Sequence, residues 1–479
     1  MKLYNTLSRT LETFEPINGK VVGLYTCGPT VYDFAHLGHM RGYTMNDVLV
    51  RALRHAGFTV KHVMNITDVG HLVSDADEGE DKMEKGARKY GKSVWDIAKE
   101  FEDFFWKSLD AMQIKRPDVS CRATDHIKEQ IALIQKLEKN GYAYVIEDGV
   151  YFDTAKFPDY GKLARLNIES LKAGARVEIV KGKKSVTDFA LWKLSPHHEK
   201  RQMEWDSPWG KGFPGWHIEC SAMSMKYLGD QFEIHTGGID HIPVHHTNEI
   251  AQSEAATGKK PFVKYWVHHN FLRIDNEKMS KSLGNFYTID DVVKRGFSPM
   301  ALRLLFLGAH YRDELNFTWD ALQASQTAWE RLLKLVAQFK KENARTELSE
   351  EKLKKIDDYR TRFFAAIEND LNTPQALSVF WEVIKSNVPS GDKFELVREF
   401  DEVLGLEIEK HAEEFANGKK VSSAEETPAE IKDLADERKT AKDRKNFVRA
   451  DALRKQIEEK GWKVVDTEQG YQLSLRIER

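Results

Sequence analysis

The sequence has few cysteines and no long apolar run. Only three cysteines occur in 479 residues, which excludes a disulfide-stabilised scaffold. No stretch is apolar over the length of a membrane span, and the start, MKLYNTLSRTLETFEP, lacks the apolar segment of an export signal. We therefore expect a cytoplasmic protein with no membrane partner, long enough to form three or four domains.

A strong net charge is also missing. The formal net charge is -3, which is not that of a general nucleic-acid binder, so any RNA contact must come from local basic surfaces. Residues 435–462 predict one such surface, a helical pair rich in Arg and Lys, with a hairpin over 462–475. The candidates for phosphate contacts are Arg438, Lys442, Arg444, Lys445 and Arg449, and Trp462 is a candidate for base stacking. A solvated charged helix is the alternative.

Four residues far apart in the chain could form one metal site: Cys27, Cys220, His245 and Glu249. Two thiolates, an imidazole and a carboxylate suit tetrahedral Zn²⁺, which can admit one more ligand when a substrate binds. His245 and Glu249 stand at i, i+4 in a predicted helix and so share a face, while His246, at i+3 to the same Glu249, is a geometric rival. Spacing alone leaves buried thiols and ordinary helix residues as an equal alternative.

Two short motifs predict a nucleotide site. A predicted strand over 21–26 runs through Cys27 and Gly28 into His36-Leu37-Gly38-His39 at a helix start, where backbone N–H groups and the helix dipole favour phosphate. Gly38 permits close approach of a base, and the two histidines share a face. Later, DNEKMSKSLGN places Lys278 and Lys281 in a predicted loop, where two ammonium groups suit a polyphosphate. Half-exposed histidines and a solvated basic loop are the alternatives.

The HLGH and KMSKS sequences resemble the signature pair of the class I aminoacyl-tRNA synthetases, and all the motifs together are similar to the cysteinyl-tRNA synthetase family over essentially the whole chain. The resemblance implies that Cys27, Cys220, His245 and Glu249 bind one zinc ion per chain, and it favours His245 over His246. For ATP it implies His36, Gly38, His39, Asp240, Lys278 and Lys281. For the cysteine substrate it implies Gly28, Thr67 and Trp216.

The implied reaction is ATP-dependent activation of L-cysteine to cysteinyl-adenylate and transfer to tRNA(Cys). In it, zinc selects the substrate thiol, Mg²⁺ accompanies ATP, and His36, His39, Lys278 and Lys281 are the catalytic residues. We expect a monomer. A related ligase that joins cysteine to a small amine, as in the mycothiol pathway, is the nearest alternative, but the basic C-terminal module argues against it. A zinc hydrolase is disfavoured because it would need an open zinc position beside a general base, whereas the motifs here surround the metal with groups for ATP. An inactive RNA-binding relative is disfavoured because the metal ligands and the lysines are intact.

Three departures from the family pattern are visible. Thr236 replaces a usual glycine, HIPVHH (241–246) replaces a more usual LxFPHH, and an acidic insert spans 70–80. The insert contains Asp75, Asp77, Glu78 and Glu80, but it does not match the calcium-loop pattern, so a solvated acidic loop is the simpler interpretation.

The alternation of strand (21–26), helix (from about 39 to 55) and strand (60–66) predicts an α/β nucleotide-binding fold. The family resemblance further implies a Rossmann-type class I synthetase catalytic domain with a connective insert, then a helical bundle and a small α+β anticodon-binding module. The expected bounds are 1–120 and 206–315 for the two halves of the catalytic domain, 121–205 for the insert, 316–408 for the bundle, 409–428 for a linker and 429–479 for the module.

Overall fold

A computed structural model gives the fold. It describes residues 1–17, 19–70, 82–166, 181–196, 201–280, 283–342, 348–418, 429–444, 446–460, 462–467 and 470–475. The acidic residues at 75–80, Lys281 and Lys445 therefore lie outside the described residues. Within the described part of the chain, no helix is both long and apolar enough to cross a membrane.

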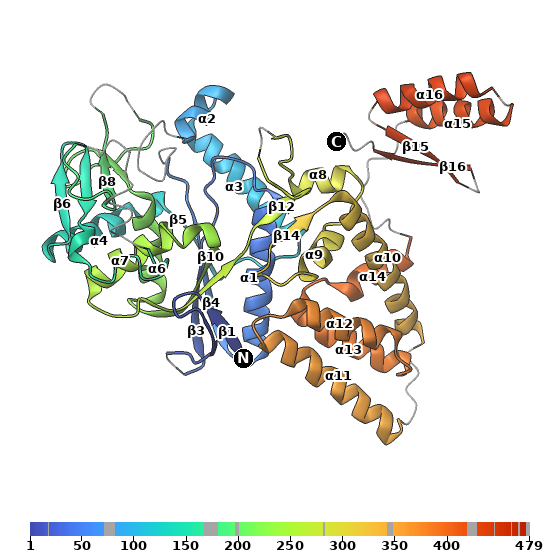
Figure 1. The fold of residues 1–479 in the computed structure, drawn as a ribbon, viewed down its shortest axis with the longest axis horizontal. Coiled ribbons are helices and arrows are strands. Elements are labelled where there is room, and N and C mark those ends of the chain that lie inside the picture. Colours follow the sequence, from blue (N-terminus) through green and yellow to red (C-terminus); the bar gives the residue numbers. More distant parts are fainter. Residues whose placement is uncertain are drawn as a thin grey trace.

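A five-stranded parallel sheet lies at the centre of the catalytic region (Figure 1). Its strands are β3 (Val21–Thr26), β4 (Thr59–Ile66), β5 (Val119–Arg122), β10 (Phe232–Gly238) and β11 (Val263–His269). Their spatial order is β11-β10-β3-β4-β5, which is the order of a Rossmann fold. The topological switch point, where the direction of the strand order reverses, lies between β3 and β10. Ligands of such sheets bind at the carboxyl ends of the strands beside the switch point. An N-terminal hairpin, β1 (Lys2–Asn5) with β2 (Thr10–Thr13), lies beside β11.

Successive residues of the central strands enter two different cores. Leu24 and Met64 face the core that contains α1 (Leu37–His55) and α3 (Val94–Ala111), whereas Tyr25 and Val63 face the core that contains α6 (Trp216–Leu228) and α7 (His245–Thr257). This two-residue period follows from strand geometry, and burial on both faces explains why VVGLYT is almost wholly apolar. A further helix, α2 (Lys82–Tyr90), packs on α3.

The connective insert is built on a four-stranded antiparallel sheet. Its strands are β6 (Ala143–Ile146), β7 (Gly149–Phe152), β8 (Phe189–Leu194) and β9 (Gly212–Pro214), accompanied by η1 (Thr124–His126), α4 (Ile127–Lys139) and η2 (Thr154–Lys156). Helix α4 precedes the hairpin that β6 forms with β7. The structure differs at the expected boundaries: β5 pairs with β4 across residue 120, and β9 extends the insert sheet beyond residue 205.

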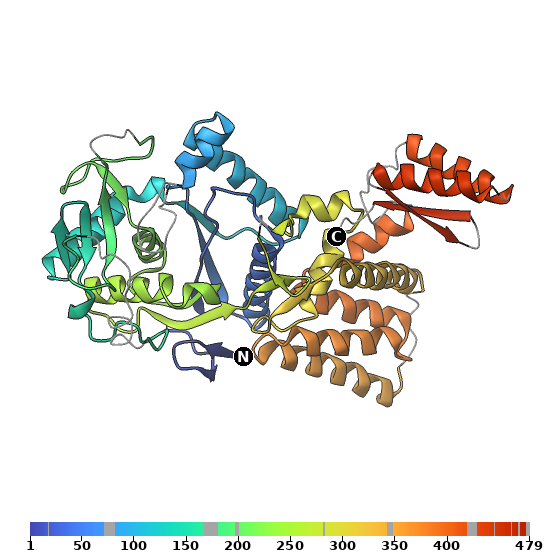
Figure 2. The ribbon, with the colours of Figure 1, turned by 45° about the horizontal axis from the view of Figure 1, so that its top comes forward.

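After β11 the chain forms a small three-stranded sheet and then helices. The strands are β12 (Leu272–Ile274), β13 (Glu277–Lys278) and β14 (Leu315–Phe317), with α8 (Ile289–Lys294) and α9 (Pro299–Leu307) between them. The bundle contains α10 (Trp319–Lys341), α11 (Glu350–Glu368), α12 (Thr373–Lys385), α13 (Ser390–Leu404) and α14 (Ile408–Ala416), and Figure 2 shows these helices beside one another. The expected linker begins inside α14, because Ile408 and Ala412 are buried at helical spacing against the bundle.

The C-terminal module has its own small core. It consists of α15 (Ala429–Asp443), α16 (Phe447–Glu459) and the hairpin of β15 (Trp462–Thr467) with β16 (Gly470–Leu475), which confirms the predicted helical pair and hairpin. The core residues are Ile431, Ala435, Ile457, Trp462 and Val464. The module stands away from the rest of the molecule in Figures 1 and 2.

Candidate metal centre and nucleotide pocket

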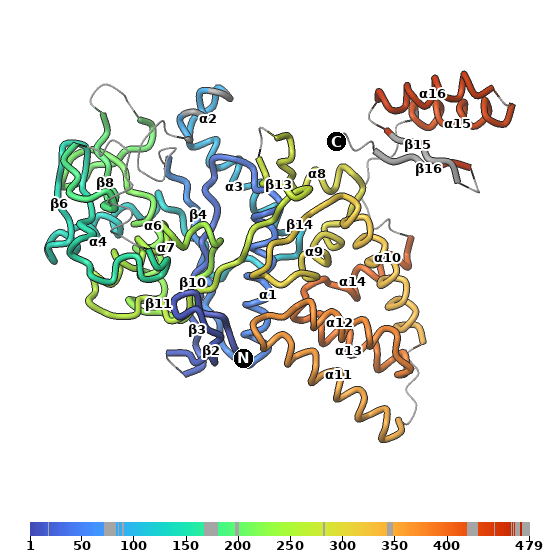
Figure 3. The backbone as a smooth tube through the Cα atoms, in the orientation of Figure 1, coloured from blue at the N-terminus to red at the C-terminus, as the bar shows by residue number. Residues whose placement is uncertain are grey.

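The four predicted metal ligands come together at the switch point. Cys27 directly follows β3, Cys220 lies in α6, and His245 and Glu249 lie in the first turns of α7. All four are buried, and one donor atom from each lies within 4.8 Å of the other three. Figure 3 shows why residues so distant in sequence meet, since the chain returns from the insert to place β10 beside β3.

The donor set fits a zinc ion. Glu249 Oε1 lies 3.0 Å from His245 Nε2 and is left without a hydrogen bond among the described residues, so this buried carboxylate oxygen is available to a cation. Burial opposes a charge on His245, yet Glu249 and Cys220 together raise the pKa of its imidazole to about 10. A hydrogen bond from Cys27 lowers the pKa of the Cys220 thiol to about 7. The cluster therefore attracts positive charge, and its thiol, imidazole and carboxylate ligands are those of zinc.

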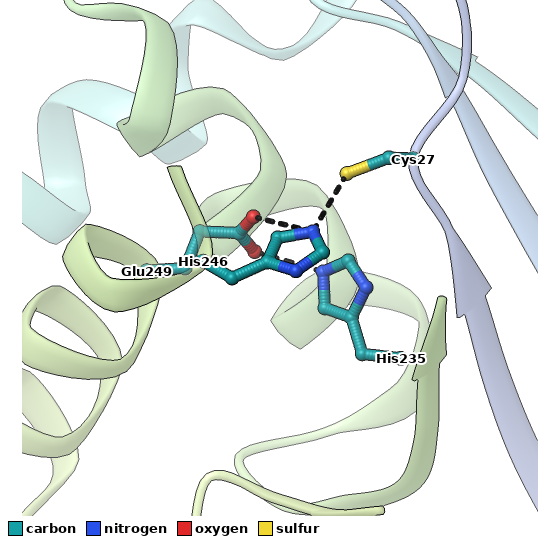
Figure 4. A group of neighbouring side chains, drawn as sticks. All are labelled: Cys27, His235, His246 and Glu249. Carbon is teal, nitrogen blue, oxygen red and sulfur yellow. Dashed lines mark hydrogen bonds and ion pairs between the residues drawn. The ribbon is translucent and has the colours of Figure 1, made fainter. Parts of the chain in front are cut away.

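A second group of donors overlaps the first, and sequence reasoning missed one of its members. Cys27 and Glu249 are also joined by His235 and His246 (Figure 4). His246 Nε2 lies 3.3 Å from Cys27 Sγ, and His235 Nε2 lies 3.0 Å from Glu249 Oε2. His235 is on strand β10, so it has no helical spacing to another candidate ligand. The signal in the sequence that could have indicated it is a histidine inside the largely apolar strand FEIHTGG.

The second nitrogen of His246 is also engaged. Its Nδ1 lies 2.7 Å from His268 Nε2, and His268 Nδ1 lies 2.7 Å from the hydroxyl of Thr6. The Thr6 hydroxyl can donate to His268 Nδ1, and His268 Nε2–H can then donate to His246 Nδ1. With Nδ1 of His246 as an acceptor, the proton of its ring is on Nε2, which faces Cys27 Sγ. His245 and His246 thus occupy different positions around Cys27, one in each donor group.

The two motif histidines form the N-cap of α1. His36 Nδ1 accepts from the backbone N–H of Gly38 and His39, and His39 Nδ1 accepts from the backbone N–H of His36. Burial lowers the pKa of His36 to about 2 and that of His39 to about 4. Both rings are therefore neutral near pH 7, and because each Nδ1 accepts, each proton resides on Nε2. The stacked rings, 3.7 Å apart, present two N–H donors rather than two charges.

A cavity at the carboxyl ends of β3 and β10 joins the metal centre to these histidines. It is lined by Cys27, Gly28, His36, His39, Asp240 and His269, among others. Asp240 lies in the short turn η3 (Ile239–His241) after β10 and is exposed. Lys278 is exposed on β13, and the Asn285 side chain donates to the Lys278 carbonyl and accepts from the Ser280 N–H.

The three residues expected around the substrate lie beside the metal centre. The Trp216 ring packs 4.4 Å from the His245 ring at the start of α6, and Thr67 is buried at the end of β4. Gly28 is required for close approach, because a Cβ there would lie 1.6 Å from the Asn65 carbonyl oxygen. The departure at Thr236 is accommodated, since its hydroxyl bonds the Thr26 hydroxyl.

Two expectations for the C-terminal module are wrong. Arg438 is only 2% exposed and Trp462 only 8%, so neither is presented at the surface for phosphate or base contact. Arg438 follows the buried Ile431 and Ala435 at helical spacing on α15, and Trp462 belongs to the core of the module. Arg444 and Arg449 are exposed.

Comparison with known proteins identifies the class of this fold and site. Residues 13–327 match the model of the family described as tRNA synthetases class I (C) catalytic domain, so the chain is a class I aminoacyl-tRNA synthetase. Solved structures agree in fold: Mycobacterium tuberculosis methionyl-tRNA synthetase in complex with methionyl-adenylate has a TM-score of 0.58 at 14% identity, covering 86% of this chain and 99% of that one. Agrobacterium radiobacter K84 agnB2 LeuRS, in a ternary complex with tRNA and LeuAMS, has a TM-score of 0.61 at 12% identity, covering 86% and 87%.

Full-length relatives narrow the assignment. Cysteine--tRNA ligase 1 of Burkholderia lata is 48% identical over 99% of this chain and 96% of its own length. The cysteine--tRNA ligase of Treponema denticola is 45% identical over 96% of each chain. The chain belongs to the cysteine--tRNA ligase family.

Proposed function

We propose that this protein is a cysteine--tRNA ligase, which activates L-cysteine with ATP and transfers it to tRNA(Cys). The observation that carries the proposal is the shared cavity, in which a group of thiol, imidazole and carboxylate donors lies next to the N-cap histidines of α1. One end of that cavity suits a thiol and the other suits phosphates. The family membership of the chain supports the same activity.

The phosphate end of the cavity accounts for the first step. The cysteine carboxylate attacks the α-phosphorus of ATP, and pyrophosphate leaves. We assign His36 and His39 to this step, because their Nε2–H groups can donate to phosphate oxygens without bringing a charge of their own. Lys278 and Lys281 would neutralise the charge that develops on the leaving pyrophosphate, and Asp240 and Gly38 would hold the nucleoside. Mg²⁺ would accompany ATP.

The metal end of the cavity accounts for amino-acid selection. Cys27, Cys220, His245 and Glu249 would hold one zinc ion per chain, which when bound supplies a soft Lewis acid that favours a thiolate over the hydroxyl of serine. Trp216 would close the pocket over a small side chain, and Gly28 and Thr67 would contact the amino-acid backbone. A preference for cysteine over serine of about a thousandfold or more is reasonable for such a metal.

The helical bundle and the C-terminal module would bind the tRNA, the bundle along the stem and the module at the anticodon. Exposed Arg444 and Arg449 are the basic residues of the module that we assign to phosphates. We further propose that the protein works as a monomer in the cytoplasm, with four domains and a linker. Their bounds are those that the sequence predicts, except that β5 and β9 shift the limits of the insert and α14 shifts the start of the linker.

Aminoacylation by the purified, metal-quantified protein tests the proposal. We expect the wild-type protein to charge tRNA(Cys) with cysteine but not with serine, and to contain one zinc ion per chain. We expect Cys220→Ser to lose both the zinc ion and the charging activity. Cys121→Ser is the matched control, because Cys121 is a buried thiol outside both donor groups. Cysteine-dependent ATP–pyrophosphate exchange without any tRNA charging would contradict the proposal.

A further inference from the structure

One turn of the helical bundle has a backbone conformation that side chains disfavour. Asp370 and Leu371, between α11 and α12, have φ angles of 60° and 52°. The left-handed region is unfavourable for any residue other than glycine, and the cost applies at both positions. Both residues are buried. Such a turn persists where the contacts around it hold it, and it often marks a functional position.

The first of these contacts comes from the N-terminal strand β1. Oδ1 of Asp370 accepts a hydrogen bond from the Tyr4 N–H at 2.8 Å. In the opposite direction, the Asp370 N–H donates to the Lys2 carbonyl at 3.1 Å. The bundle turn is therefore tied to the strand that lies beside the catalytic sheet, and Figure 1 shows the N-terminus at the boundary between that sheet and the bundle.

A second set of contacts comes from the segment between α9 and β14. The Tyr311 hydroxyl donates to Asp370 Oδ1 at 2.6 Å, and Arg312 Nε donates to Oδ2 at 2.7 Å. His310 Nε2 lies 2.9 Å from the Asp370 carbonyl oxygen. Both carboxylate oxygens thus have donors, which a carboxylate that is only 3% exposed requires. We call this meeting of the bundle turn, β1 and residues 310–312 the Asp370 joint.

The same segment is also held from the side of the nucleotide cavity. Arg41 of α1 donates to the carbonyls of His310 and Asp313. The segment continues into β14, which pairs with β12, and β12 pairs with the strand that bears Lys278. His269 lines both the nucleotide cavity and a small second cavity that Leu371 of the bundle turn also lines. The Asp370 joint therefore connects the bundle to the site proposed for adenylate formation.

The transfer step makes a strict demand on this connection. The terminal ribose of the tRNA must reach the adenylate in the cavity, whereas the body of the tRNA is assigned to the bundle and the C-terminal module. A small rotation of the bundle would move the terminal ribose away from the reacting carbon, and misplacement by about 1 Å can cost a hundredfold in rate. The bonds of Asp370 run to two separate segments, so they fix an angle as well as a contact.

We propose that Asp370 is a positioning residue for the transfer step, because it sets the angle of the bundle against the catalytic region and so places the terminal ribose of a bound tRNA at the cysteinyl-adenylate. This proposal rests on the proposed function. Adenylate formation should depend little on Asp370, since Arg41 holds its side of the segment by separate bonds. Affinity for tRNA should also depend little on it, since Asp370 is buried and leaves the surface of the bundle unchanged.

Asp370→Asn in the full-length, zinc-loaded protein tests this inference. The asparagine oxygen can keep the bonds of Tyr4 and Tyr311, but its amide group meets the donor of Arg312. We expect the rate of cysteinyl transfer from preformed adenylate, in a single turnover at saturating tRNA(Cys), to fall at least tenfold. ATP–pyrophosphate exchange and the Kd of tRNA(Cys) should stay within threefold of wild type.

Val383→Ala is the matched control, because Val383 is a fully buried residue of α12 outside the joint. We expect this variant to unfold at a lower temperature and to keep all three quantities within threefold of wild type. A fall in transfer as large as that of Asp370→Asn would show that loss of stability alone explains the effect, and it would overturn the inference.

Tyr311→Phe and Arg312→Gln keep the test decisive if Asp370→Asn does not fold, since each removes one bond to the carboxylate. We expect each to lower the transfer rate at least threefold without changing exchange or tRNA affinity. Transfer at the wild-type rate in these variants, or exchange that falls in parallel with transfer, would overturn the inference. Failure of the proposed function would look different, since the wild-type protein would then show no cysteine-dependent ATP–pyrophosphate exchange.

Discussion

At the scale of single residues, His36 uses the two nitrogens of one ring for two purposes. Nδ1 caps helix α1, and Nε2 faces the cavity proposed for ATP. An asparagine can replace the first function, because its side-chain oxygen is a good N-cap acceptor, but it is too short to replace the second.

Substitutions of His36 should therefore separate stability from activity. We expect His36→Asn to keep the stability of wild type within about 0.5 kcal/mol and His36→Ala to lose about 1 kcal/mol, measured by urea unfolding. Both should lower the rate of ATP–pyrophosphate exchange by about a hundredfold or more. Normal exchange in the asparagine variant would show that Nε2 has no part in the reaction.

Asp68 should make stability depend on pH. Burial raises the pKa of Asp68 to about 6, although two hydrogen bonds from Thr124 oppose the shift. Because the folded pKa lies above the usual value near 4, the folded protein keeps a proton that the unfolded chain has lost, and stability falls as pH rises between about 4 and 6.

Asp68→Asn removes that charge and can keep both bonds to Thr124, since the threonine hydroxyl can accept from the new amide. We expect the variant to be more stable than wild type at pH 8, by up to about 3 kcal/mol, with a smaller difference at pH 5. Thermal unfolding at the two pH values measures this. A gain of the same size at both would contradict the assignment of the raised pKa.

Residue by residue, the sequence predicted those parts of the site that carry a local pattern. His36 and His39 were found by their spacing, and His245 and Glu249 by theirs. His235 was missed because its partner Glu249 comes from another element, so only the packing of β10 on α7 brings them together. The burial of Arg438 and Trp462 was missed for the related reason that charge and size do not tell which face of a small module is inward.

At the scale of elements, helix α1 connects the two signature motifs. Arg41, only 4% exposed, donates to four backbone carbonyls: Asn270 and Phe271 before β12, and His310 and Asp313 before β14. Strands β12 and β14 pair with each other, and β12 pairs with the strand that bears Lys278. One guanidinium thus fixes the helix of His36 and His39 relative to the root of the KMSKS loop.

Arg41→Lys should damage this connection although it keeps the charge. A lysine presents three donors from one point and cannot reach four carbonyls on two segments. We expect a loss of about 2–4 kcal/mol in the free energy of unfolding, because buried carbonyls lose their donors, and a rise in the KM of ATP that exceeds any rise in the KM of cysteine. Arg54→Lys, a change of an exposed arginine on the same helix, should alter neither quantity appreciably. Equal effects of the two substitutions would refute this role.

Elements were predicted more closely than the boundaries between domains. The strands over 21–26 and 60–66 and the helix between them are confirmed, because apolar period and capping residues are local properties. The predicted limits of the insert differ from those in the structure, because β5 and β9 are short strands whose pairing partners lie far away in the sequence. The start of the linker was misplaced because α14 has only two buried residues among many charged ones.

At the scale of the whole molecule, the C-terminal module is set apart from the catalytic region. Its helices and hairpin pack around their own core, and it stands away from the sheet in Figures 1 and 2. Removal of residues 429–479 should therefore leave the adenylate-forming site intact. We expect ATP–pyrophosphate exchange within threefold of wild type and tRNA charging reduced by about two orders of magnitude or more, because the phosphate contacts of the module would be lost. Exchange that fell in parallel with charging would show that the module supports the active site itself.

The distance in sequence between the two halves of the proposed metal centre has a consequence during synthesis. Glu249 is made 222 residues after Cys27 (249 minus 27). At about 5–20 residues per second, the ribosome takes roughly 10–45 s to cover that interval, so the first thiol waits unprotected through the translation of the whole insert. A cell under oxidative stress would therefore injure this enzyme most readily while it is being made, and a pulse of peroxide should inactivate newly synthesised chains far more than mature ones.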